Sequence, residues 1–234
     1  MKATVIGCGR WGSFIAWYLR KIGHEVTLYG REGSRHIEQF CRTRTNGLVT
    51  LEDDVRITTN LREALESELI CISIRSQNLP DLMAQIAAQN VSGKTFALCM
   101  KGIEVTTLRR LSEIAEEAVG DCNDVAVWLG PGHVQEFVNG VPNCMVIDSR
   151  SEAVKERLIA WLSGGLIRFY YGTDLIGNEI GAAAKNCGRH AGRHGSFFAQ
   201  GRADEPRHEG SFPIDRSDGR QRLFGLWFVP SGRL

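Results

Sequence analysis

Three glycines near the start of the chain have the spacing of a phosphate-binding turn. The segment 5–12 reads V-I-G-C-G-R-W-G, so that Gly7, Gly9 and Gly12 follow the pattern G-x-G-x-x-G. In such a turn the first glycine allows a tight bend, the second lets the backbone approach a pyrophosphate, and the third lets the next helix pack closely. The free amides at the helix N-terminus then face the phosphates. Because a strand-like segment precedes the glycines and a helical pattern follows them, they predict a dinucleotide site; the alternative is an ordinary strand–helix turn.

A basic residue, Arg31, follows the second predicted strand, at the position that distinguishes NAD from NADP in such sites. The second predicted strand, 26–29, leads into Y-G-R at 29–31. An NAD-selective site normally has an acidic residue at the end of this strand, where it holds the ribose 2′-hydroxyl. The guanidinium of Arg31 instead suits a 2′-phosphate, which favours NADP and leaves NAD open; the alternative is a solvated loop arginine. Further arginines are interpreted as a basic loop near the phosphates rather than a nucleic-acid site, namely Arg35, Arg42 and Arg44.

The elements that must position these groups alternate between strands and helices. Apolar runs and turn signals predict strands at 3–6, 26–29, 55–58, 69–74, 95–98, 125–129, 143–147 and 166–170. Helical spacing of apolar residues predicts helices at 13–22, 61–66, 79–89, 106–119 and 152–162. This alternation predicts an α/β fold with a Rossmann-like, doubly wound, mostly parallel sheet, followed by the start of a helical substrate domain and an irregular tail. Ligand sites in such sheets lie beyond the carboxyl ends of the strands, which is where the glycine turn, Lys101 and Gly130 occur.

The composition argues against several classes of function. With a net charge of +1 over 234 residues, the chain has no global attraction to nucleic acid or to a membrane surface. Its apolar runs are too short to span a bilayer, and the first strand follows Met1 so closely that no signal peptide is expected. The seven cysteines are scattered without a C-x-x-C pair, which is typical of reduced thiols and indicates neither disulfides nor a metal site. We therefore expect a cytoplasmic protein.

Four motifs occur in a fixed order along the chain. They are G-C-G-R-W-G at 7–12, K-G-I-E at 101–104, G-P-G-H-V-Q-E at 130–136 and D-L-I-G-N-E-I-G-A-A-A-K-N at 174–186. In order and spacing they resemble those of the bacterial NAD(P)-dependent glycerol-3-phosphate dehydrogenases. The resemblance covers residues 1–186, and the last motif is the most specific. It implies interconversion of dihydroxyacetone phosphate and sn-glycerol 3-phosphate for glycerophospholipid synthesis, and it leaves open a homodimer in the intact family.

The resemblance also implies roles for individual residues. Together with the glycine pattern, it assigns cofactor contacts to Gly7, Gly9, Arg10, Trp11, Gly12, Arg31, Lys101 and Val134. It assigns substrate contacts to Lys101, Gly130, Gly132 and Lys185. Lys185 is then the residue that transfers the proton, with Lys101 as its catalytic neighbour. Gly132 departs from the Ser or Thr that is commoner in the family, so a hydroxyl contact is lost there or replaced by a backbone amide.

The chemistry of two lysines agrees with this assignment. Hydride transfer to a ketone leaves an alkoxide that needs a proton, and a lysine supplies it when burial or a neighbouring cation lowers the lysine pKa. Lys185 lies among alanines and Lys101 arrives from a strand end as a neighbouring cation, so Lys185 is expected to meet the requirement. The alternative for Lys185 is a surface lysine on a helix, and the alternative for Lys101 is a solvated lysine at the end of a strand. In the same motif, Glu179 is interpreted as a structural hydrogen-bonding partner rather than a base.

The motifs and a change of composition predict the domain organisation. Residues 1–172 are expected to form the dinucleotide-binding domain, 173–186 the first helix of the helical substrate domain, and 187–234 an out-of-frame or disordered tail. The tail contains eight Gly and eight Arg in 48 residues, has no Lys, and keeps no amphipathic period. A missing substrate domain is expected to leave the sheet face that it would cover exposed.

A frameshift explains the tail. When the codons of 199–209 are written degenerately and read one base later, they permit L-K-G-A-L-M-S-R-G-T-R, which resembles the substrate-domain signature of the family with its phosphate-binding arginine. We therefore expect a shift of frame near Asn186 or Cys187 that impairs activity. The alternative is a genuine, lineage-specific tail.

Two other functions fit parts of the pattern. One is another two-domain dehydrogenase, such as a hydroxyacyl-CoA dehydrogenase or a ketopantoate reductase, which substrate-dependent oxidation of NADPH would distinguish. The other is a non-catalytic NAD(P)-binding protein, for which Lys185 would be dispensable.

Overall fold

The computed structural model describes residues 1–191, with side chains described for 1–185. Its strands are β1 (Lys2–Ile6), β2 (Glu25–Tyr29), β3 (Arg56–Thr58), β4 (Leu69–Ile72), β5 (Thr95–Leu98), β6 (Asp124–Leu129), β7 (Asn143–Asp148) and β8 (Ile167–Tyr171). They form one sheet in the order β3-β2-β1-β4-β5-β6-β7-β8. The pairing of β6 with β7 is antiparallel, and the other neighbouring pairs are parallel. The predicted α/β fold with a mostly parallel, Rossmann-like sheet is therefore confirmed.

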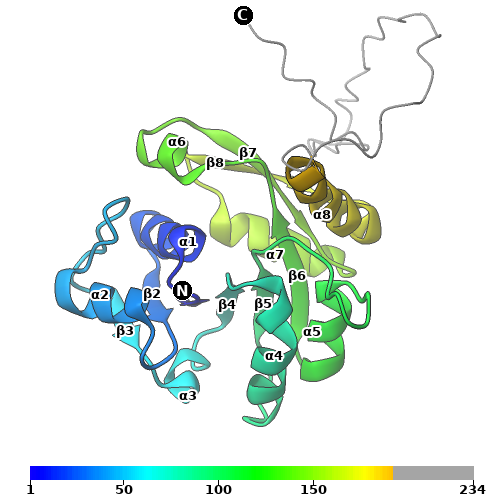
Figure 1. Cartoon of the computed structure of the whole chain (residues 1–234), viewed down its shortest axis with the longest axis horizontal. Coiled ribbons are helices and arrows are strands. Elements are labelled where there is room, and N and C mark those ends of the chain that lie inside the picture. Colours follow the sequence, from blue (N-terminus) through cyan, green and yellow to red (C-terminus); the bar gives the residue numbers. More distant parts are fainter. Residues whose placement is uncertain (192–234) are drawn as a thin grey trace, which may run out of the picture.

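Helices cover both faces of the sheet from β2 to β6 (Figure 1). They are α1 (Arg10–Lys21), α2 (Arg35–Thr43), α3 (Leu61–Ala64), the 3₁₀ turn η1 (Ser76–Asn78), α4 (Leu79–Ala87), α5 (Leu111–Val119), α6 (Val134–Val138), α7 (Glu152–Leu162) and α8 (Leu175–Ala191). One core lies between the sheet and α1, α2, α6 and α7, and the second lies between the sheet and α3, α4 and α5.

The central strands are apolar because both of their faces are covered. All four residues of β4, L-I-C-I, are buried. Leu69 and Cys71 belong to one core, whereas Ile70 and Ile72 belong to the other, as the alternation of side chains along a strand requires. A parallel strand covered by helices on both faces therefore reads as a continuous apolar run rather than an alternating one.

The segment before α5 is a turn rather than the predicted first part of a helix at 106–119. The carboxylate of Glu104 accepts hydrogen bonds from the amides of Thr106 and Thr107, each at 2.7 Å. Leu108 then adopts a φ of 58°, which interrupts helical geometry, and α5 begins only at Leu111. The prediction was wrong here because a buried carboxylate takes the amides of this segment.

The basic segment after β2 is also ordered differently from the prediction. Arg35 and Arg42 lie on helix α2 rather than in the predicted basic loop. The guanidinium of Arg44 donates to the carbonyl oxygens of Leu51, at 3.4 Å, and Val55, at 2.6 Å. Arg44 therefore holds the α2–β3 connection together, and the interpretation of this arginine as part of a phosphate-facing loop is wrong.

The sheet ends at Tyr171, and α8 continues to Ala191, five residues beyond the predicted limit at Asn186. Residues 186–191 read N-C-G-R-H-A and contain no proline, so the change of composition does not stop the helix. Of the proposed tail at 187–234, residues 192–234, which include the expected frame-shifted signature, lie outside the described residues. The division into domains stays a prediction.

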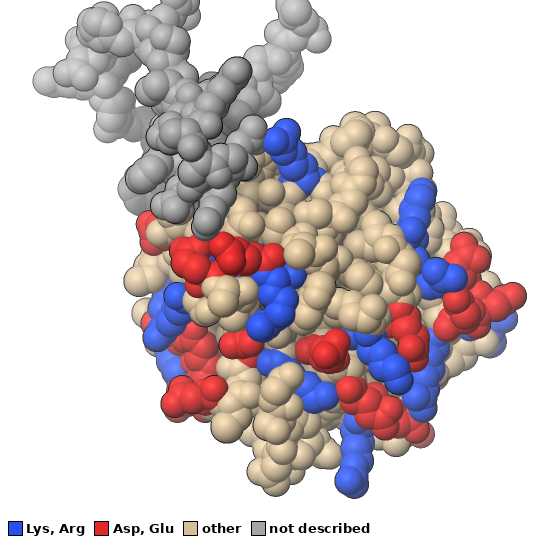
Figure 2. Space-filling model, turned by 180° about the vertical axis from the view of Figure 1, so that it is seen from behind, with Lys and Arg blue, Asp and Glu red and all other residues tan. Residues whose placement is uncertain are grey.

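The surface of the described part exposes some apolar side chains and mixes the two signs of charge. The large exposed apolar side chains of the described part are Val105, Leu108, Val138, Val141, Ile176 and Ile180, and none belongs to a strand. The expected exposure is found in part, because the second core contains no residue of β7 or β8, and on that face Cys144 and Arg168 are exposed while Val146 and Tyr170 are half-buried. Acidic and basic side chains are interspersed on the face seen in Figure 2. Among the described helices, none is both long and apolar enough to cross a bilayer.

Candidate active site

A cleft of about 1050 Å³ opens at the carboxyl ends of five neighbouring strands. Its walls come from the turns after β1, β2, β4, β5 and β6, and they include residues 6–11, 29–31, 73–76, 99–101, Gly130 and Gly132. This is the edge where the sequence predicts a ligand site. The structure thus brings Gly7, Gly9, Arg10, Trp11, Arg31, Lys101, Gly130 and Gly132 to one cavity.

The three glycines of the first turn are needed for three different reasons. Gly7 has a φ of +118°, and a Cβ there would collide with the carbonyl oxygen of Ser73. A Cβ on Gly12 would collide with the carbonyl oxygen of Gly7, so Gly12 sets the close approach of α1 to the turn. A Cβ on Gly9 would meet no atom within 4 Å. Gly9 therefore leaves free space on the cleft side, which a ligand can use.

The N-terminus of α1 is open to the cleft. Gly9 is its N-cap residue, no side chain caps the helix, and the first turn contains no acidic residue. The first-turn amides are thus available to an anion, as helix N-termini generally are. Trp11 lines the cleft and packs against Phe14 and Phe137 in tilted ring contacts, with ring centroids 5.1 and 6.1 Å away. The arrangement fits a bound pyrophosphate.

The cleft lining is strongly cationic. Its basic side chains are Arg10, Arg31, His36, Arg75 and Lys101, whereas Asp81 is the one carboxylate among the described lining residues. A cleft lined by one sign of charge concentrates ligands of the opposite sign. It therefore favours a ligand that carries several negative charges.

Two cysteines on the cleft wall stay protonated thiols. Burial, with a smaller contribution from Cys41, raises the pKa of Cys8 to about 12, and its Sγ donates to the carbonyl oxygen of Tyr29 at 3.3 Å. Burial also raises the pKa of Cys99 well above its usual value. Because the thiolate is the nucleophile of cysteine chemistry, neither residue is suited to covalent catalysis.

Lys101 lines the cleft, whereas Lys185 lines only a small neighbouring cavity that it shares with Lys101. Lys101 Nζ donates to the carbonyl oxygen of Gly130 at 2.5 Å. A second, small cavity of about 10 Å³ is lined by both lysines and Gly130, together with Asn178, Gly181 and Ala182 of α8. Lys101 and Gly130 also line the main cleft, so the two cavities are neighbours. Lys185 itself is exposed, as is Ala184, so the expectation that the alanines bury this lysine was wrong.

Two glycines of the β6–α6 connection lie under Met145. A Cβ on Gly130 would come within 2.7 Å of Met145 Cγ, and one on Gly132 would collide with the ring of Phe137. A serine or threonine would not fit at position 132 without movement of that ring. Val134, a predicted cofactor contact, is only 7% exposed, packs into the core and does not line the cleft. Gly12, also a predicted cofactor contact, does not line the cleft either.

Sequence reasoning missed several residues of the cleft. Ser34 and His36 follow the end of β2, and residues 73–76 follow β4, where Arg75 adds a further cation. The strand-end rule that selected Lys101 applies equally to 73–76 and would have found them. Asp81 and Gln85 of α4 have no such signal, because only the packing of α4 directs them toward the cleft.

Residues 2–155 match the family described as NAD-dependent glycerol-3-phosphate dehydrogenase N-terminus. The chain belongs to this glycerol-3-phosphate dehydrogenase family. The NAD(P)+ glycerol-3-phosphate dehydrogenase of Thermoanaerobacter sp. (strain X514) is 33% identical over 192 residues, which make up 80% of this chain and 57% of that protein. The enzyme of the same name from Ehrlichia ruminantium (strain Welgevonden) is 34% identical over 207 residues, 83% of this chain and 63% of that protein. The chain thus spans little more than half the length of these relatives.

Solved structures agree with the fold of the family. The crystal structure of glycerol-3-phosphate dehydrogenase from Coxiella burnetii superimposes with a TM-score of 0.73 at 24% identity, over 79% of this chain and 57% of that one. The enzyme from Plasmodium falciparum gives a TM-score of 0.71 at 16% identity, over 80% and 56% of the two chains. The resemblance stated from the four motifs is therefore confirmed at the level of the family and the fold.

Proposed function

We propose that the cleft binds NADP(H) or NAD(H), and that the reaction of the intact site interconverts dihydroxyacetone phosphate and sn-glycerol 3-phosphate for glycerophospholipid synthesis. The observation that carries this proposal is the meeting of the glycine turn, Lys101 and Gly130 in one cleft, with Lys185 in a small cavity that Lys101 and Gly130 also line. A cytoplasmic location, a small-molecule substrate and a homodimer in the intact family belong to the same proposal.

The cleft lining fits a dinucleotide and favours NADP. The open space at Gly9 and the uncapped N-terminus of α1 suit a pyrophosphate. Beyond β2, the cleft is lined by Arg31, Ser34 and His36, and the described lining there includes no carboxylate that could accept a hydrogen bond from a ribose 2′-hydroxyl. A guanidinium with a hydroxyl and an imidazole beside it suits a 2′-phosphate. When bound, the nicotinamide supplies the hydride that reduces the carbonyl carbon of the substrate.

Two lysines transfer the proton and stabilise the negative charge that develops during the reaction. Lys185 Nζ gives a proton to the substrate oxygen on reduction and takes it back in the reverse direction. Lys101 Nζ, anchored on the carbonyl oxygen of Gly130, holds a positive charge at the strand ends and stabilises the negative charge that develops on that oxygen. The remaining cations of the cleft attract an anionic substrate and cofactor.

A fluorescence titration tests the cofactor part of the proposal. Trp11 and Trp128 both line the cleft, so their emission should fall when a reduced nicotinamide binds. We expect saturable quenching by NADPH and weaker binding of NADH. The absence of quenching by both dinucleotides would contradict the proposal, and preferential binding of NADH would contradict the preference for NADP.

A substrate panel tests the reaction. NADPH oxidation is followed with dihydroxyacetone phosphate, ketopantoate and a 3-oxoacyl-CoA. Turnover with one of the last two would favour the alternative dehydrogenases. Cofactor binding without turnover on any substrate is the result expected if the tail is out of frame, and resequencing codons 180 to 234 then decides. An uninterrupted frame that encodes no substrate-domain signature would reject the frameshift.

A further inference from the structure

We propose that Glu179 is a positioning residue for Lys185. Its carboxylate fixes α8 on α5 through Arg110 and Ser112, so that Lys185 shares a cavity with Lys101. The catalytic consequence rests on the function proposed above, whereas the placement of the two lysines can be tested without cofactor or substrate.

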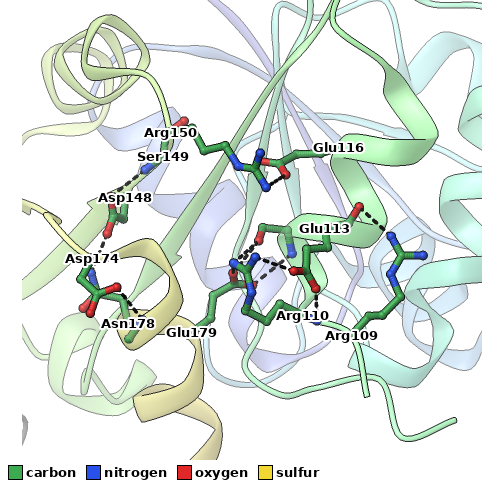
Figure 3. A network of polar contacts seen from close by, with 12 residues as sticks. Arg109, Arg110, Glu113, Glu116, Asp148, Ser149, Arg150, Asp174, Asn178 and Glu179 are labelled. Carbon is green, nitrogen blue, oxygen red and sulfur yellow. Dashed lines mark hydrogen bonds and ion pairs between the residues drawn. The ribbon is translucent and has the colours of Figure 1, made fainter. Parts of the chain in front are cut away.

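Glu179 is held by three hydrogen bonds from the start of α5 (Figure 3). Arg110 Nη1 donates to Oε2 at 2.9 Å, and the Ser112 amide donates to Oε1 at 3.0 Å. The Ser112 hydroxyl donates to Oε2 at 2.5 Å. Glu179 is 5% exposed and Arg110 is 9% exposed, so this clamp is shielded from water. The sequence interpretation of Glu179 as a hydrogen-bonding partner agrees with these contacts.

The other end of the clamp is rigid. Arg110 Nη2 donates to Glu113 Oε1 at 2.7 Å, and Glu113 Oε2 accepts from the Arg110 amide at 3.0 Å. The guanidinium is therefore fixed between two carboxylates. Because Ser112 belongs to the first turn of α5, its amide has no partner within the helix and favours an anion. The start of α5 thus offers a defined set of donors, which the carboxylate of Glu179 on α8 accepts.

A neighbouring residue anchors α8 to the sheet. Asn178 Nδ2 donates to Asp148 Oδ2 at 2.6 Å, where β7 ends. Asp148 is 1% exposed, and Lys155 Nζ lies 3.8 Å from its other oxygen. Two consecutive residues of α8 therefore bind two different elements. Asn178, Ala182 and Lys185 then fall on one helical face and line the small cavity with Lys101.

Apolar packing alone gives α8 little orientation. Of its described side chains, those of Glu179 and Ala183 are buried, whereas Ile176 is 54% exposed and Ile180 is 47% exposed. Leu175 and Ala182 pack only at the margin of the core. A helix held by so few apolar contacts takes its rotation from its polar anchors. Loss of Glu179 should therefore turn Lys185 away from Lys101 while the sheet stays intact.

Cross-linking of the full chain tests the clamp. A short reagent that joins two amines is applied to the wild type, Glu179→Ala, Glu179→Asp and the control Glu68→Ala, and the Lys101–Lys185 product is measured by mass spectrometry. Glu68 is exposed and precedes β4, at the opposite edge of the sheet from the cleft. We expect the yield to fall about fivefold in Glu179→Ala, because the helix then samples other orientations. It should recover in part in Glu179→Asp and stay unchanged in the control.

Each outcome has a definite meaning. An unchanged yield in a folded Glu179→Ala variant overturns the proposal, as does a wild type whose two lysines react with a monofunctional reagent but never cross-link to each other. If Glu179→Ala fails to fold, Ser112→Ala removes one hydroxyl donor only, and an unchanged yield there overturns the proposal as well. Where turnover is measurable, Glu179→Ala should lower kcat and leave the KM for NADPH unchanged. Failure of NADPH to bind the wild type contradicts the proposed function and does not affect the cross-linking result.

Discussion

Lys101 Nζ donates a hydrogen bond to the carbonyl oxygen of Gly130 at 2.5 Å, which links the segments that follow the adjacent strands β5 and β6. The contact places an ammonium group at the boundary between the main cleft and the small cavity that Lys185 also lines. The hydrogen bond to a backbone carbonyl oxygen holds the ammonium group of Lys101 in one position. The candidate chemistry therefore depends on strand ends that the sheet brings together.

Replacement of this lysine should weaken cofactor binding. We expect Lys101→Met to reduce NADPH affinity about threefold to tenfold, because one charge-assisted contact is lost. Tryptophan quenching measures the change. Lys94→Met is a matched control, since Lys94 precedes β5 at the other edge of the sheet and its Nζ donates to the carbonyl oxygen of Glu66. Equal affinities of the two variants would count against a role for Lys101 in the cleft.

The proposed 2′-phosphate site makes a prediction about selectivity. Arg31→Ala should weaken NADPH binding about tenfold to a hundredfold, as expected from the loss of hydrogen bonds to a charged group worth about 1.5–3 kcal/mol. NADH affinity should change by no more than about twofold, since NADH lacks this phosphate. Arg35→Ala is the control, because Arg35 is exposed on α2 and does not line the cleft. A parallel loss of NADH and NADPH binding would place Arg31 elsewhere on the cofactor.

Alanine at Gly9 should separate binding from stability. The N-cap Gly9 has a φ of −69°, and an added Cβ meets no atom within 4 Å. We expect Gly9→Ala to change the free energy of unfolding by no more than about 0.5 kcal/mol, as for other unstrained substitutions. NADPH binding should be lost because the methyl group occupies the space left for the pyrophosphate. Gly165→Ala, which also meets open space but away from the cleft, should change neither quantity.

Alanine at Gly12, unlike alanine at Gly9, should mainly lower the stability of the fold. Its Cβ would collide with the carbonyl oxygen of Gly7, so α1 must move away from the turn. We expect the free energy of unfolding to fall by roughly 1–3 kcal/mol, the usual cost of overpacking. Urea denaturation measures it, with Gly165→Ala as the control. A Gly12→Ala variant as stable as the wild type would show that α1 does not pack on the turn in this way.

The turn before α5 should respond to acid. Hydrogen bonds from the Thr107 hydroxyl and from the amides of Thr106 and Thr107 lower the pKa of Glu104 from 4.5 to about 2. A carboxyl whose pKa is lower in the folded state stabilises the fold above its unfolded pKa, and this stabilisation is lost as the pH falls from about 4.5 toward 2. We expect Glu104→Gln to be less stable than the wild type near neutral pH. The difference, measured by urea denaturation, should shrink on acidification, and a difference that is constant with pH would contradict the assignment.

The sequence by itself determined the parts of this protein that depend on short-range physics. The glycine spacing at 7–12, the apolar run of β4 and the limits of α7 at Glu152–Leu162 were read correctly, because turn geometry, burial on two faces and helical period each leave a local pattern. The family motifs pointed to the same dehydrogenase family that the comparison of residues 2–155 then showed.

Only the tertiary structure decided how distant segments meet. Glu179 and Arg110 are 69 residues apart, and nothing in either local sequence states that they pair. The turn at Glu104 displaced the start of α5 because a buried carboxylate competed for backbone amides, and Asp81 and Gln85 reached the cleft only through the packing of α4. Such contacts arise from the closing of long loops and the burial of polar groups, which depend on the whole fold rather than on any one window of residues.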